Sequence, residues 1–308
     1  RCSDAITSAV PLRLCPMAIG WQVLDLTDFR GDVTVRRGWL YAGEARAASL
    51  EDLSGVIVGP AVRVTAAALA AVAERGVAVT LGAYGGRKPA TVMSVSNAER
   101  VAARHRAQAE SAAPVAKRLW REIVKAKVVA QAGNVLGPAR DRLLEYAREV
   151  RSGDSTNVEG RAARIYWAAL RPNGEWRRDP DGTDDWNAAL NYGYGVLRNH
   201  MYSAVFAAGL WPTYGVYHRH RSNPGCLVDD LLEPFRPLID RIVFGHLPAD
   251  ALDSPAARRS LAAALEMEAA DGQKVRAALN AWAQSVGAYF ESPDERVPSP
   301  PAVIKPRT

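Results

Sequence analysis

Cysteine is scarce in this sequence, and its placement does not suggest a structural role. Only three of the 308 residues are cysteine, namely Cys2, Cys15 and Cys226, and no two of them form a Cys-X-X-Cys pair. An odd number of widely spaced cysteines argues against a disulfide framework and against a structural zinc site. The pattern favours a protein of a reducing compartment.

Long apolar runs are also missing. No stretch approaches the roughly 20 apolar residues that a membrane helix requires, and the first 16 residues have neither a signal-peptide core nor a clear cleavage site. We therefore expect no membrane partner. Positive charge, by contrast, is in excess: the net charge is +6 and the pI is near 9.3, which favours a polyanionic partner such as nucleic acid.

The spacing of apolar residues changes near residue 95 and divides the chain in two. Residues 17–95 contain short segments in which apolar and polar residues alternate, as in half-buried strands, and one alanine-rich helix from Thr65 to Gly76. Residues 96–291 have helical spacing almost throughout. The sequence therefore predicts an α+β protein, with a small β-rich N-terminal domain followed by a larger all-α C-terminal domain.

Two terminal segments are expected to lie outside these domains. Residues 1–16 precede Met17, a plausible natural start, and are expected to form a disordered extension. Residues 292–308 contain five prolines and too little apolar surface to fold alone, which predicts a disordered tail. Within the second domain, helices are expected at residues 114–132, 141–150, 157–170, 185–209 and 254–291.

Glu159 is the first candidate for chemistry. It falls in the first turn of a helix that Thr156 or Asn157 can cap, where a glutamate that complements the helix dipole is the ordinary interpretation. Gly160 weakens that interpretation, because glycine in a helix costs about 1 kcal/mol relative to alanine. A glycine there would let another backbone or a ligand come close.

A second cluster surrounds a Ser-Asn-Pro-Gly turn. His218 precedes the turn, and Asp230 and Glu233 follow it, three residues apart on one face of a helix. A packed histidine and solvated helix charges would give the same pattern. Two carboxylates and an imidazole suit Mg²⁺ or Mn²⁺, and such an ion beside a basic surface is typical of phosphoryl transfer.

Basic residues form a candidate DNA-binding face. Lys117, Arg121 and Lys125 share one stripe of a predicted helix at i, i+4 spacing, which suits contact with successive phosphates. A solvated helix face, with an ion pair such as Arg118–Glu122, is an equally good interpretation.

The remaining candidates are neighbours of these groups. His220 follows His218 closely, and the flanking Arg219 and Arg221 would steer a phosphate toward the cation. Asn191 and Tyr192 stand in the sequence LNYGYG, where glycine interrupts the helical spacing. Core packing is the ordinary explanation for that sequence, and side chains that face the site are the alternative.

Four segments together resemble one family. They occur in the order seen in the CRISPR-associated endonuclease and integrase family Cas-one, most like its type II branch. The segments are LWREIVKAKVVAQAGNVL, SGDSTNVEGRAARIYW, NAALNYGYGVLRNHMYSAVFAAGL and GVYHRHRSNPGCLVDDLLEPFRPLIDRIV. The β-rich half ahead of them is also similar to that family's N-terminal domain, so the resemblance covers residues 21–290.

The resemblance implies an activity, a site and partners. Members of that family join the 3′-hydroxyls of a short DNA duplex, the prespacer, into a CRISPR repeat by metal-dependent transesterification in the prokaryotic cytoplasm. The family's metal ligands fall on Glu159, His218 and Glu233 of this sequence, with Asp230 as a supporting residue. The resemblance also implies a homodimer formed through the β-rich domain, and a heterohexamer in which two such dimers flank a dimer of the small Cas-two protein.

Three other functions remain open at this point. The first is a non-catalytic DNA-binding subunit of the acquisition complex, the second is a transposon-type integrase of the same fold, and the third is an unrelated helical metallohydrolase acting on small phosphoesters. The complete Glu/His/Glu set argues against the first, and the basic stripe argues against the last. A transposon-type integrase would be expected to carry an added helix-turn-helix domain.

Overall fold

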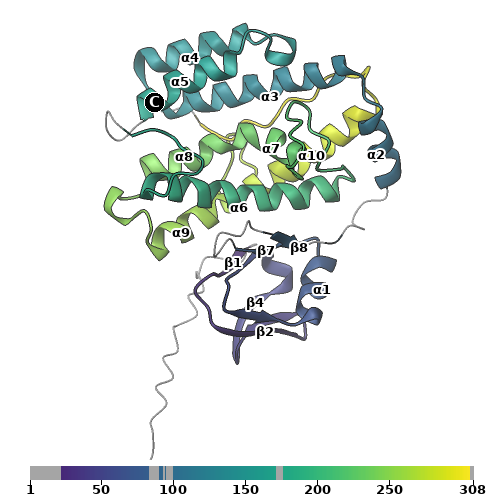
Figure 1. The fold of residues 1–308 in the computed structure, drawn as a ribbon, viewed down its shortest axis with the longest axis vertical. Helices are drawn as coiled ribbons and strands as arrows, with labels where there is room; N and C mark the ends of the chain where they lie inside the picture. The colour runs from purple at the N-terminus through teal and green to yellow at the C-terminus, as the bar shows by residue number, and fades with distance from the viewer. Residues whose placement is uncertain (1–21, 83–89, 93, 95–99, 171–175, 306–308) are drawn as a thin grey trace, which may run out of the picture. The chain divides into compact units, whose positions relative to one another are not determined.

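The computed structural model describes residues 22–82, 90–92, 94, 100–170 and 176–305. These residues belong to two compact units, Arg1–Met93 and Ser94–Thr308. In Figure 1 the first unit is rich in strands and the second is almost entirely helical. The predicted α+β class, with a small β-rich unit followed by a larger helical one, is confirmed.

The N-terminal unit contains two four-stranded sheets. The first has parallel β1, β5 and β7 with β8 antiparallel at its edge, and the second has the order β4-β3-β2-β6. The strands are β1 (Gln22–Leu26), β2 (Gly31–Arg36), β3 (Trp39–Ala42), β4 (Ala45–Ser49), β5 (Leu53–Val58), β6 (Val62–Val64), β7 (Val79–Leu81) and β8 (Ala90–Val92). A short 3₁₀ helix, η1 (Leu50–Asp52), joins β4 to β5.

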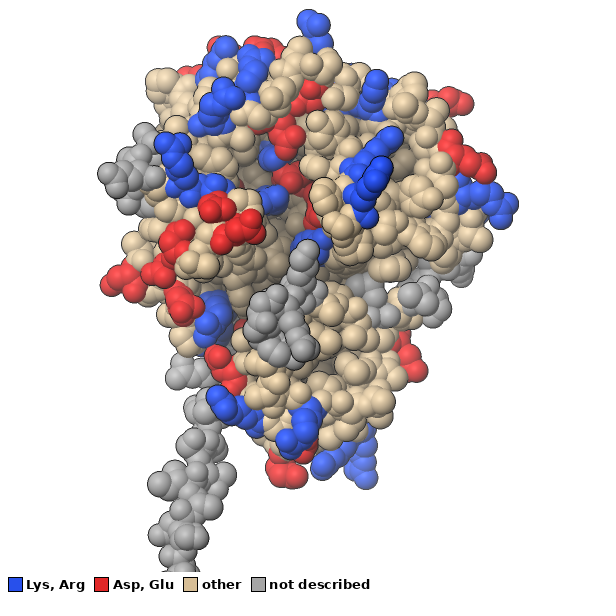
Figure 2. All heavy atoms as spheres, viewed as in Figure 1, with Lys and Arg blue, Asp and Glu red and all other residues tan. Residues whose placement is uncertain are grey.

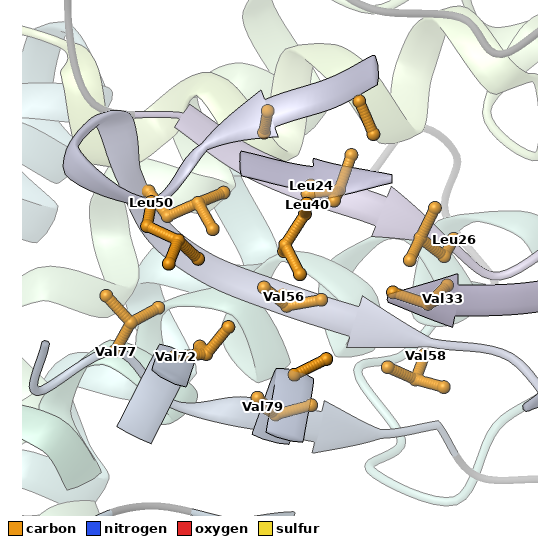
Figure 3. Packing of buried hydrophobic residues seen from close by; sticks show 14 of the residues in the cluster. Leu24, Leu26, Val33, Leu40, Leu50, Val56, Val58, Val72, Val77 and Val79 are labelled. Carbon is orange, nitrogen blue, oxygen red and sulfur yellow. The ribbon is translucent and has the colours of Figure 1, made fainter. Parts of the chain in front are cut away.

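One apolar core joins the two sheets to the helix of this unit. Leu26 and Val56 of the first sheet, Leu40 of the second and Val72 of α1 (Ala66–Glu74) belong to the same buried cluster (Figure 3). Thr65 caps α1 by accepting a hydrogen bond from Ala68 N. The alternation of apolar residues therefore forms strands because each buries one face against this core.

The second unit is a set of helices packed around two of their number, α3 and α6. The inner face of α3 contacts α4, α5, α8 and η3, so side chains on that face meet elements that are distant in sequence. The helices are α2 (Val101–Ala109), α3 (Ala113–Asn134), α4 (Gly137–Glu149), α5 (Val158–Leu170), α6 (Asp185–Ala207), α7 (Cys226–Leu232), α8 (Arg236–Gly245), α9 (Pro255–Ala262) and α10 (Val275–Glu291). Short 3₁₀ turns lie between them at η2 (Ser152–Asp154), η3 (Glu233–Phe235), η4 (Ala249–Ala251) and η5 (Ala263–Glu266).

The prediction of one helix over residues 254–291 is wrong. Ser254 caps α9 as expected, with its hydroxyl accepting a hydrogen bond from Ala257 N. The chain then leaves the helical path and resumes only at α10. Gly272, with a φ of +85°, lies in the intervening turn, a conformation that glycine adopts without strain.

The C-terminal segment is better packed than a disordered tail. Val303 and Ile304 are buried, and Ala270 N donates a hydrogen bond to Ala302 O at 2.9 Å. A side chain at Gly133 of α3 would come within 2.7 Å of Ile304, so the glycine makes room for the tail. The prolines prevent regular structure, but two apolar side chains are enough to hold the segment. The predicted extension at residues 1–16 lies outside the described residues.

Within the described residues, no helix has both the length and the apolar character needed to cross a membrane.

Candidate active site

Two carboxylates from different helices meet at one lysine. Glu159 is the second residue of α5, Glu233 begins η3, and Lys127 lies on the inner face of α3. Lys127 Nζ is 2.6 Å from Glu159 Oε1 and also 2.6 Å from Glu233 Oε2. The side chains of Lys127 and Glu233 are 14% and 7% exposed, so the contacts are shielded from water. The two predicted carboxylates therefore converge on a single cationic point.

Charges around Glu233 keep it ionised. Arg236 Nη1 lies 3.0 Å from Glu233 Oε1, on the side away from Lys127. Burial alone would raise the pKa of Glu233, but Lys127 and Arg236 overcome that effect and hold it at about 2. Burial would likewise lower the pKa of Lys127, but Glu233 and Glu159 raise it, so the ammonium stays charged.

Asp230 holds His218 in place. Asp230 is completely buried, and its carboxylate lies 2.5 Å from His218 Nδ1 while accepting a hydrogen bond from Tyr217 N at 2.8 Å. The bond to Asp230 raises the pKa of His218, and the nearby charges of Glu233 and Glu159 raise it further. The imidazole is thus within electrostatic reach of both carboxylates. With Nδ1 engaged, Nε2 is the ring nitrogen available to a metal, the arrangement typical of metal-binding histidines.

The loop that carries His218 is folded tightly against its neighbours. A side chain at Gly215 would come within 2.2 Å of His218 O and 3.0 Å of Asp230 Oδ2, so only glycine fits there. The Tyr217 ring stacks on Trp120 of α3, with 4.5 Å between centroids and 4° between planes. These contacts explain how a loop residue acquires a defined position.

Asn157 caps α5 as the sequence predicts, and Asp154 adds a second cap. Asp154, which the sequence reasoning did not select, accepts hydrogen bonds from Val158 N at 2.8 Å and Glu159 N at 2.9 Å. Asn157 accepts one from Gly160 N at 3.2 Å.

Gly160 accommodates a neighbouring side chain. A Cβ at this position would lie 2.7 Å from Asn157 Oδ1. The glycine therefore makes room for the turn that begins α5, and the hypothesis that it admits a ligand or another backbone is not needed to explain it.

Several other predicted residues have different surroundings. Asn191 accepts a hydrogen bond from Arg178 at 2.6 Å and donates one to Pro180 O at 3.0 Å, which ties α6 to the loop before it. Tyr192 is half-buried on α6. His220 is exposed, and its Nδ1 lies 3.1 Å from Ser222 Oγ. These hydrogen bonds of Asn191 and His220 are to groups other than the two converging carboxylates.

Gly193, the first glycine in LNYGYG, has a packing explanation. A Cβ at Gly193 would lie 2.5 Å from Ile239 Cγ2 and 3.1 Å from Leu261 Cδ2. The absence of a side chain therefore lets α6 pack closely against α8 and α9, which is the ordinary interpretation of that sequence.

The candidate DNA-binding residues are exposed. Lys117, Arg121 and Lys125 lie on the outer face of α3, and Arg121 pairs with Glu122 at 2.6 Å. Figure 2 shows Lys and Arg side chains across the helical unit, with Asp and Glu side chains in a hollow between them.

Two further basic candidates line a cavity at the His218 loop, the segment of residues 208–225 between α6 and α7. Arg219 and Arg221 are both exposed. With Gln108 and Tyr214 they line a cavity of about 680 Å³. Arg118 contacts Tyr289 rather than forming the predicted pair with Glu122.

Lys127 and Arg236 were missed by the sequence reasoning. A signal for Lys127 exists: with Gln131 and Asn134 it forms a polar stripe at i, i+4 and i+7 on the otherwise apolar inner face of α3. Arg236 follows Glu233 by three residues, which places the two on one helical face. Polar groups on a buried face require partners, and that requirement points to the site.

Two carboxylates and an imidazole are ligand types that suit a divalent cation. Within the described residues, however, no three His, Cys, Asp or Glu side chains are grouped closely enough to hold one. Lys127 lies between the two carboxylates. Glu233 Oε2 is buried and has this ion contact but no well-aligned hydrogen bond among the described residues. A buried carboxylate oxygen that lacks a well-aligned hydrogen bond is suited to binding a metal.

The sequence and the fold match known proteins. Residues 30–271 match the family model described as CRISPR associated protein Cas1. The CRISPR-associated endonuclease Cas1 of Neisseria meningitidis serogroup C (strain 8013) is 35% identical over 212 residues, covering 67% of this chain and 68% of that protein.

Solved structures share the fold at low identity. One is a casposase bound to an integration product, with a TM-score of 0.69, 18% identity, and coverage of 91% of this chain and 92% of that chain. Another is a Cas6-RT-Cas1–Cas2 complex, with a TM-score of 0.72, 19% identity, and coverage of 94% and 37%. The family match and the endonuclease relative confirm the resemblance seen in the sequence. The chain belongs to the CRISPR associated protein Cas1 (Cas-one) family, whose relative in Neisseria meningitidis is named an endonuclease, and it is an enzyme.

Proposed function

We propose that this chain joins the 3′-hydroxyl ends of a prespacer duplex to a CRISPR repeat, with Glu159, His218 and Glu233 holding a divalent cation. The observation that carries the proposal is the convergence of Glu159 and Glu233 on one cationic point, with His218 in electrostatic reach of both. In the reaction the prespacer 3′-hydroxyl loses its proton as its oxygen forms a bond to a phosphorus at an end of the repeat. The bond from that phosphorus to the 3′-oxygen of the adjoining nucleotide breaks, and this leaving oxygen takes up a proton.

The bound Mg²⁺ or Mn²⁺ would stabilise charge on the reacting phosphate and on the attacking and leaving oxygens. The other residues position its ligands. Asp230 fixes the tautomer and direction of the His218 ring, because it holds Nδ1. Arg236 fixes one oxygen of Glu233 and leaves the other directed at the shared cationic point. Such positioning is the protein's main contribution to phosphoryl transfer.

DNA would be held by the exposed basic residues. Lys117, Arg121 and Lys125 offer a row of cations for one backbone, and Arg219 and Arg221 lie next to the His218 loop. Structures with this fold include a casposase bound to an integration product and a Cas1–Cas2 complex. By extension, the partners proposed here are prespacer and repeat DNA, a second copy of this chain, and a dimer of Cas2 in a heterohexamer.

A strand-transfer assay tests this function. The purified chain and its small partner are incubated with a supercoiled plasmid carrying a CRISPR repeat and a labelled short duplex with free 3′-hydroxyls, in Mg²⁺, Mn²⁺ or EDTA. The expected result is covalent transfer of label to the plasmid in either metal and none in EDTA. Tight DNA binding without joining in any metal would instead identify a non-catalytic subunit.

A further inference from the structure

The charges around the two carboxylates are balanced. Glu159 and Glu233 each carry one negative charge, and Lys127 and Arg236 contact them directly with one positive charge each. The neighbouring Asp230 carboxylate contacts His218 Nδ1 at 2.5 Å. Where the two glutamates converge, their negative charges are therefore already offset by Lys127 and Arg236 before any metal binds.

Of the two cations, Lys127 is the one that can move from the carboxylates to another partner. It contacts both carboxylates at 2.6 Å, whereas Arg236 contacts Glu233 on the oxygen away from the shared point. A lysine ammonium is a compact charge on a flexible stem of four methylenes, so it can turn from a carboxylate to a nearby phosphate. Arg236 is held by more contacts, with its guanidinium 4.3 Å from the Tyr194 ring centroid as well as paired with Glu233.

We propose that Lys127 makes metal binding and DNA binding at this site depend on each other. This inference rests on the proposed function of the site. A divalent cation that approaches the point shared by Glu159 and Glu233 is repelled by the Lys127 ammonium, which already contacts both carboxylates, so it binds weakly alone. A DNA phosphate supplies negative charge and a new partner for the ammonium, which frees the carboxylates for the metal. By linkage, the metal strengthens DNA binding by the same factor as DNA strengthens metal binding.

The direction of one mutational effect separates this role from a structural one. Lys127→Met keeps the length of the side chain and removes its charge. A lysine that only holds the carboxylates in place would, when replaced, leave metal binding weaker or unchanged. A lysine that opposes the metal would, when replaced, leave an excess negative charge and make metal binding tighter.

Binding of Mn²⁺ alone to the full chain is measured by electron paramagnetic resonance of the free ion, without DNA and with a short duplex. For the wild type, DNA should tighten Mn²⁺ binding at least about tenfold. For Lys127→Met, Mn²⁺ binding without DNA should be about tenfold tighter than in the wild type, and the additional effect of DNA should be smaller. Lys274→Met, which removes an exposed lysine outside the site, should behave as the wild type.

Weaker or unchanged Mn²⁺ binding in Lys127→Met would overturn the proposal. So would a wild type whose Mn²⁺ affinity changes less than about threefold with DNA, a measurement that needs no variant to fold. Circular dichroism melting checks the variant, and Lys127→Gln replaces it if the methionine form does not fold. If strand transfer fails while these binding effects are seen, the proposed reaction is wrong and this inference stands; if no Mn²⁺ binds under any condition, both fail.

Discussion

Replacing Glu233 with glutamine should destabilise the helical unit by an amount that depends on pH. The pKa of Glu233 is about 2 in the folded protein and 4.5 in its ordinary state, because Lys127 and Arg236 outweigh the effect of burial. The folded pKa is the lower of the two, so the stabilisation is complete above about pH 4.5 and is lost as pH falls through about 2. The shift corresponds to about 3 kcal/mol at pH 7 and to about half of that at pH 3.

The assay is urea unfolding of the wild type and Glu233→Gln in EDTA at pH 7 and pH 3, followed by the fluorescence of the buried Trp120 and Trp282. The difference between the two proteins should shrink by about half between these pH values. Glu149→Gln, which alters a half-exposed pair with Arg161, is the matched control and should show little difference at either pH. An equal loss at both pH values, or no loss at pH 7, would refute the electrostatic reasoning.

Three further substitutions test individual contacts of the helical unit. Gly215→Ala should cost about 1–3 kcal/mol in urea unfolding and reduce strand transfer, since its side chain would overlap the backbone at His218, whereas Gly195→Ala, with open space around it, should be tolerated. Asp230→Asn should move the midpoint of the pH–rate profile of strand transfer to lower pH, because Asp230 raises the pKa of His218 and the ring must be neutral to bind a metal; an unchanged midpoint would contradict this. Ile304→Ala should lower the unfolding free energy by about 2–5 kcal/mol, and a loss below about 0.5 kcal/mol would show that the tail does not contribute to the fold.

The architecture was accessible from the sequence because its signals are local. The alternating residues of the first unit and the 3.6-residue spacing of the second are properties of neighbouring positions, and the caps at Thr65 and Ser254 follow the same logic. The break between α9 and α10 was not predicted, since alanine-rich spacing on both sides hides a turn that only Gly272 indicates. The tail was misjudged because its partner, Gly133, is far away in sequence.

The site could be predicted only in part from the sequence, because some of its contacts join segments that are distant in the chain. Glu159, His218 and Glu233 were selected by residue type and family resemblance, and whether they bind metal remains a prediction. Lys127 was missed because its role depends on two contacts with distant segments, not on its neighbours in α3. Asp154 was missed as a cap because it reaches α5 from a 3₁₀ turn with a positive φ of 48°.

The most direct test of the central claim compares two glutamate variants in the strand-transfer assay. Glu159→Gln removes one carboxylate of the converging pair, and Glu149→Gln removes a half-exposed carboxylate at the end of α4. If Glu159 binds the catalytic cation, Glu159→Gln should abolish metal-dependent joining while its DNA affinity stays within a few-fold of the wild type, and Glu149→Gln should join normally. Joining at wild-type rates in Glu159→Gln would contradict the assignment of the site.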